Sequence, residues 1–102
     1  MTGPFILRNH GSASDPVASL PILGQYLKSF RDTPDGRGFA EYTADPMQAL
    51  QFKTQGDAFE FVRQQSKTKS KRADGKANRP LTSCHMEILP LLMAVESKGL
   101  PI

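Results

Sequence analysis

The chain has 102 residues and a net charge of +3, with one cysteine and no tryptophan. This length suits a single domain with a modest core, and the content of aliphatic and aromatic residues predicts a folded chain. One cysteine excludes an internal disulfide. No charged-then-apolar leader and no apolar run of membrane-spanning length is visible, so we expect a soluble protein of the cytoplasm.

The N-terminal half predicts three strands. Residues 5–7 are a short apolar run typical of a buried strand, and residues 25–30 and 39–43 are strands joined by a turn at 32–38. These two strands form an antiparallel hairpin. On the first of them, a period of two predicts that two aromatic residues share one face and a leucine takes the other: Tyr26 and Phe30 against Leu27.

A helix follows at residues 54–66. Thr54 and Asp57 have the spacing of a capping box, and the pattern after them places four apolar side chains on one arc: Ala58, Phe59, Phe61 and Val62. A helix of about three turns is marginal when isolated, so this apolar arc predicts packing on the sheet. A shorter helical turn is predicted before it, at Asp45-Pro46.

A strongly basic loop follows the helix. Between residues 63 and 79 the chain has seven Lys or Arg residues and one Asp. These cations are the candidate contacts to a partner or a nucleic acid: Arg63, Lys67, Lys69, Lys71, Arg72, Lys76 and Arg79. Arg37, between two turn glycines, is a secondary candidate. The loop binds phosphates, binds an acidic protein surface, or is simply solvated. It contains no aromatic residue, so base stacking on the loop itself is not expected.

A strand with one buried face is predicted at residues 82–88, after Pro80. Arg79, just before it, either binds a phosphate or carboxylate or caps a sheet edge. Tyr26 and Tyr42 either offer stacking surfaces or are half-buried strand residues.

Catalytic and metal chemistry have little support in the sequence. Cys84 and His85 are neighbours on a predicted strand and would point to opposite faces, which does not suit a shared metal site. Asp32 and Asp35 lie in a hydrated turn, where acid–base tuning is not expected. We therefore expect no enzyme, no metal and no cofactor.

The C-terminal segment forms either a short helix or a frayed tail. If the helix forms, three apolar residues at helical spacing after Pro90 would pack on the core or on a second copy of the chain: Leu91, Leu92 and Val95. The expected organisation is one domain at residues 1–90 and a short helix or tail at 91–102, in a monomer or homodimer.

Three segments together resemble a class of small proteins encoded in phages and prophages of proteobacteria. They are GQYLKSF at 24–30, TADPMQALQF at 43–52 and DGKANRPLT at 74–82, and the resemblance covers about residues 5–90. It implies a phage accessory protein in a bacterial host cytoplasm, where such proteins commonly bind host machinery, including defence complexes. It implies no particular activity.

The sequence thus predicts a small α+β domain, in which an antiparallel sheet of about four strands is covered on one face by the main helix. The first functional hypothesis is a non-catalytic inhibitor or modulator that binds a host protein or nucleoprotein complex through the basic loop. The alternative is direct nucleic-acid binding through the same loop. A weaker alternative is a structural phage component that self-assembles through its apolar tail.

Overall fold

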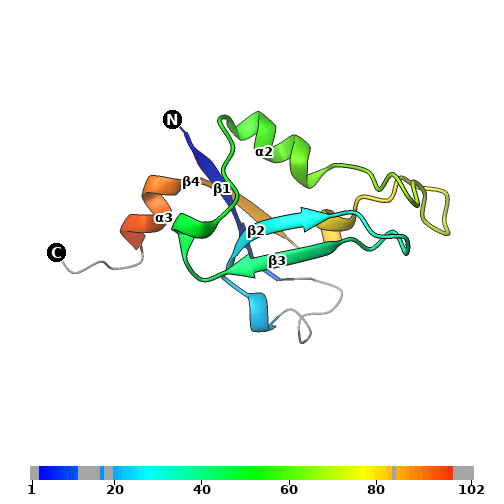
Figure 1. Ribbon diagram of the computed structural model, residues 1–102, viewed down its shortest axis with the longest axis horizontal. Helices are drawn as coiled ribbons and strands as arrows, with labels where there is room; N and C mark the ends of the chain where they lie inside the picture. The colour runs from blue at the N-terminus through cyan, green and yellow to red at the C-terminus, as the bar shows by residue number, and fades with distance from the viewer. Residues whose placement is uncertain (1–2, 12–16, 18–19, 84, 98–102) are drawn as a thin grey trace.

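The computed structural model describes residues 3–11, 17, 20–83 and 85–97, and these form one antiparallel four-stranded sheet with helices on both faces (Figure 1). The strands are β1 (Phe5–Asn9), β2 (Tyr26–Arg31), β3 (Phe39–Thr43) and β4 (Met86–Pro90), in the order β3-β2-β1-β4. The helices are α2 (Gln55–Val62) and α3 (Leu91–Ser97), with short 3-10 turns η1 (Leu20–Ile22), η2 (Pro46–Gln48) and η3 (Pro80–Ser83). The predicted α+β class is confirmed.

Helix α2 covers one face of the sheet. Its first turn is capped by Thr54, whose hydroxyl accepts a hydrogen bond from the Asp57 N–H at 3.0 Å, as the sequence predicts. Beneath the helix lies a buried cluster, which we call the α2-side cluster: Leu7, Leu27, Ala58 and Leu81. Burial of these side chains holds a helix that is too short to be stable alone.

The opposite face is covered over the end of the sheet where β4 runs into α3. Here η2 and α3 pack on a second cluster, which we call the α3-side cluster: Ile6, Tyr26, Ala49, Leu89 and Ala94. Of the two alternatives for the C-terminal segment, the short helix forms, at Leu91–Ser97. Leu91 packs on this cluster and Val95 is half-buried, while Leu92 remains 69 % exposed.

A β-bulge changes the predicted faces of β2. The pairing of β2 with β3 shifts register between Leu27 and Ser29, so one extra residue reverses the alternation beyond it. Phe30 consequently packs with Leu27 in the α2-side cluster, whereas Tyr26 lies on the other face. The prediction that Tyr26 and Phe30 share a face is wrong for this reason.

Helix α2 is shorter than the predicted helix at 54–66 and exposes one of its aromatic residues. The helix ends at Val62, and beyond it the Ser66 N–H donates to the Asn78 carbonyl, where the chain enters the basic loop. Phe59 is 51 % exposed and lies against the Arg63 guanidinium, with 5.4 Å from the ring centroid to Cζ. Only part of the predicted apolar arc therefore faces the sheet.

The predicted strand at residues 82–88 begins four residues late. Residues 80–83 form η3, in which the Thr82 N–H and hydroxyl both donate to the Arg79 carbonyl. Strand β4 starts at Met86, where it pairs with Asn9 of β1. Pro80 has no N–H for a ladder, and the local hydrogen bonds of η3 replace pairing at this point.

Candidate functional site

The basic loop is anchored to the hairpin turn by one carboxylate. Asp32, directly after β2, accepts hydrogen bonds from the Ser66 hydroxyl at 2.8 Å and from the N–H groups of Lys67 at 2.7 Å and Thr68 at 3.1 Å. The Thr68 hydroxyl in turn donates to the Thr33 carbonyl at 2.5 Å. The loop and the turn are therefore joined by several hydrogen bonds between residues far apart in the sequence.

A second anchor lies at the tip of the turn. Asn78 donates through its side-chain amide to the carbonyls of Gly36 at 2.6 Å and Lys69 at 2.9 Å. Gly36 is buried, and a Cβ on it would lie 2.7 Å from the Cβ of Lys69 and 2.8 Å from the amide nitrogen of Asn78. The backbones thus approach at a distance that only glycine permits.

The loop is itself folded as a small hairpin. Lys71 and Ala77 form an isolated antiparallel β-bridge, and the Arg72 N–H donates to the Lys76 carbonyl at 2.8 Å. The Arg72 guanidinium also forms a salt bridge with the Asp74 carboxylate at 2.9 Å. The loop therefore has both internal pairing and tertiary anchors, while its residues from Lys67 to Lys76 are exposed to solvent. We call residues 32–38 and 66–79 together the basic platform.

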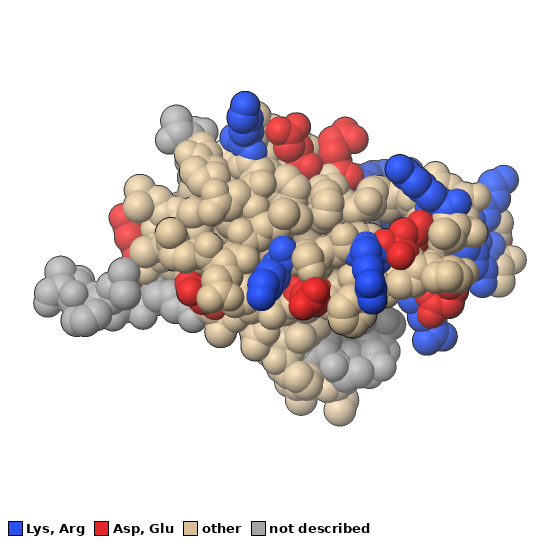
Figure 2. Space-filling view, in the orientation of Figure 1, with Lys and Arg blue, Asp and Glu red and all other residues tan. Residues whose placement is uncertain are grey.

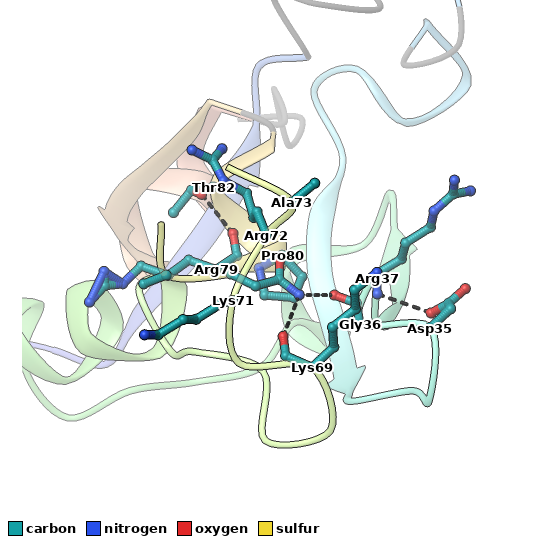
Figure 3. A pocket seen from close by; sticks show the side chains of 12 residues that line it. Asp35, Gly36, Arg37, Lys69, Lys71, Arg72, Ala73, Arg79, Pro80 and Thr82 are labelled. Atoms are coloured by element: carbon teal, nitrogen blue, oxygen red, sulfur yellow. Dashed lines mark hydrogen bonds between the residues drawn. The ribbon is translucent and has the colours of Figure 1, made fainter. Parts of the chain in front are cut away.

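The basic platform lies at one end of the molecule, at the right in Figure 1, and Figure 2 shows Lys and Arg side chains gathered at that end. Five of them line an open pocket of about 530 Å³ between the loop and the turn: Arg37, Lys69, Lys71, Arg72 and Arg79. One acidic residue, Asp35, also lines it. In Figure 3, Lys71 and Arg79 point to one side of the view, Arg37 points to the other and Arg72 to a third direction. The positive side chains therefore start around one pocket and point away from each other.

Two predicted contact residues are partly engaged within the protein. Arg79 donates through Nε to the Arg63 carbonyl at 2.9 Å, so it caps the end of α2 and not a sheet edge. The Arg63 guanidinium lies over Phe59. Lys67 and Lys76 belong to the basic platform but do not line the pocket. Of the two tyrosines considered as stacking surfaces, Tyr26 is buried and Tyr42 half-buried.

Acidification should release the Asp32 anchor. The hydrogen bond from the Ser66 hydroxyl, followed by those from the N–H groups of Lys67 and Thr68, lowers the pKa of Asp32 below its ordinary value of 3.8. At a pH above the ordinary pKa of an Asp side chain, the ionised carboxylate therefore stabilises the docked loop. This contribution is lost as the pH falls through the lower pKa that Asp32 has in the folded state.

We expect the amide resonances of Lys67 and Thr68 to shift together with a midpoint below 3.8 in an NMR titration. Asp32→Asn should abolish this titration and weaken docking, because one oxygen that accepts from N–H groups becomes a donor. Asp74→Asn, which removes one negative charge within the loop hairpin, is the control and should leave both the titration and the docking intact. A midpoint at or above the ordinary value would contradict the anchor.

Another polar cluster lies outside the basic platform. Glu87 on β4 accepts from Arg8 at 2.6 Å and 2.9 Å and pairs with His10 at 2.7 Å. The hydrogen bond to His10, then that to Arg8, lowers the pKa of the Glu87 carboxyl. Within the described ranges, no group of three His, Cys, Asp or Glu side chains is arranged to hold a metal ion. The predicted strand position of Cys84 falls outside the described residues, while His85 is exposed.

Comparison of the chain with protein-family models, with curated proteins and with solved structures gave no match. In the part of the chain that the structure describes, no helix is long and apolar enough to span a membrane.

Proposed function

We propose that this protein is a non-catalytic binding protein that uses the basic platform to contact the phosphate backbone of a nucleic acid. The observation on which the proposal depends is the divergence of the cations around the pocket (Figure 3). A single small anion is best held by groups that converge on it. Cations that point in different directions from an ordered loop suit a polyanion, whose successive phosphates are several ångströms apart.

The composition of the basic platform favours phosphates over an acidic protein surface. Residues 32–38 and 66–79 contain no Leu, Ile, Val, Met or aromatic side chain. Stable protein interfaces usually have an apolar core surrounded by a polar rim, and the platform offers only the polar part. Binding to a phosphate backbone needs no apolar core, because release of counterions drives it.

The preorganisation of the loop adds to this argument. Asp32 and Asn78 fix the loop on the hairpin turn before any ligand arrives. The cations therefore lose less backbone entropy on binding than those of a free chain would. An ordered platform accordingly supports binding better than the same charges on a disordered segment.

The proposal is tested by fluorescence anisotropy of labelled single- and double-stranded oligonucleotides, titrated with the full chain at several salt concentrations. Contact of all five cations with the phosphates of one single strand predicts a slope of about −3.5 in a plot of log affinity against log salt. Binding that is absent even at low salt would contradict the proposal. In that case, capture of one host protein complex would favour the hypothesis of a phage inhibitor that binds a protein target.

A further inference from the structure

We infer that Phe39 and Arg31, beside the basic platform, form a stacking site for an unpaired base, so that the nucleic acid bound is single-stranded. This inference rests on the proposed function and specifies its ligand. Phe39 begins β3, two residues after Arg37 of the pocket lining, and its side chain is 48 % exposed. A large aromatic side chain thus lies open to solvent next to the cations.

Strand pairing sets the direction of Phe39. Its cross-strand partner is Arg31, while the next pair, Phe30 and Ala40, packs in the α2-side cluster. Because neighbouring residues on a strand point to opposite faces, Phe39 lies on the face away from α2. Helix α3 and η2 cover this face over the α3-side cluster, to which neither Phe39 nor Arg31 belongs. The sheet therefore presents this aromatic ring at the end where the platform lies.

Arg31 holds a guanidinium over the ring. Its Cζ lies 5.0 Å from the centroid of Phe39. An aromatic ring beside an arginine is a combination that binds nucleobases, since the ring stacks on the base and the guanidinium adds a cation–π contact or reaches a phosphate. Bases in a duplex are already stacked on each other, so only an unpaired base is free to use this site.

Single-strand binding proteins combine such a ring with a positive track for the backbone. Here the two parts meet at one hairpin: Arg31 ends β2 and Phe39 begins β3, while the turn between these strands carries Arg37 and holds the docked loop. The loop lacks aromatic residues, and the strand beside it supplies one.

The absence of tryptophan from the chain allows a direct test. Phe39→Trp introduces the only tryptophan of the chain, which can be excited separately from the two tyrosines. We expect an oligothymidylate of about 12 nucleotides to quench its fluorescence on binding, with affinity kept or raised. Phe39→Leu keeps an apolar side chain without a ring. We expect it to weaken single-strand binding roughly 5- to 100-fold while leaving duplex binding unchanged.

Phe59 gives matched controls. It too is a half-exposed phenylalanine under an arginine, but it lies on the outer side of α2. The fluorescence of the Phe59→Trp variant should not be quenched by the oligothymidylate, and Phe59→Leu should leave the affinity for single strands unchanged. If Phe39→Leu binds single strands as wild type does, or if duplex is preferred, the stacking site is refuted while the phosphate contacts stand. If no oligonucleotide binds even at low salt, both the stacking site and the proposed function are refuted.

Discussion

A double variant with Lys69→Glu and Lys71→Glu binds single-stranded nucleic acid roughly 100-fold more weakly than wild type at about 0.1 M salt, on our account. Both residues line the pocket, and both ammonium groups belong to the folded loop. The change removes two phosphate contacts and places two carboxylates beside the remaining phosphates. The slope of log affinity against log salt should therefore become shallower by at least one unit. Anisotropy titrations over a range of salt measure both quantities.

The matched control is Lys28→Glu with Lys53→Glu. These lysines are exposed, lie outside the basic platform and give the same change in net charge. If net charge alone attracts the nucleic acid, the two double variants weaken binding equally. Our account requires a loss at least tenfold greater for the pair in the pocket. Equal losses would mean that the position of the cations does not matter.

The second large effect is expected at Gly36. This glycine has φ of +76°, and a Cβ on it would lie 2.7 Å from the Cβ of Lys69, closer than two carbon atoms can pack. Gly36→Ala must both strain the turn and separate the loop from it. We expect a loss of about 2–3 kcal/mol in the free energy of unfolding, measured by denaturant titration. The affinity for nucleic acid should fall as well, because the loop loses its anchored position.

Gly75→Ala separates the two causes. Gly75 has a similar φ of +83°, but no atom lies within 4 Å of the position that a Cβ would take, so substitution there strains the backbone without a clash. We expect this variant to lose about 1 kcal/mol and to keep the loop on the turn. If Gly36→Ala and Gly75→Ala behave alike in stability and in affinity, the close approach of loop and turn is not structurally important.

The sequence predicts the local elements well because their signals are local. The Thr54 cap, the Asp45-Pro46 turn and the hairpin with its turn at 32–38 depend on neighbouring residues, and each forms as expected. The β-bulge after Leu27 does not have such a signal. It reverses every later side chain on β2, which is why Phe30 lies on the face opposite to the predicted one.

The charge of the site is also evident from the sequence, but its assembly is not. The Lys and Arg run is visible directly, whereas the anchors connect residues more than 30 positions apart, such as Asp32 with Lys67 and Gly36 with Asn78. The glycines at 36 and 38 are a usable sign of a close backbone approach. The sequence does not single out Phe39, because its exposure depends on which face each helix covers.

The most direct test of this account is whether loop and turn are docked in the free protein. In a ¹⁵N- and ¹³C-labelled sample near neutral pH, we expect nuclear Overhauser effects between the Gly36 α-protons and the side chains of Lys69 and Asn78. The contacts at Gly36 place these groups in van der Waals reach. Observing them, with dispersed amide shifts at Lys67 and Thr68, would establish a preformed basic platform. Random-coil shifts across residues 66–79 without these contacts would contradict it.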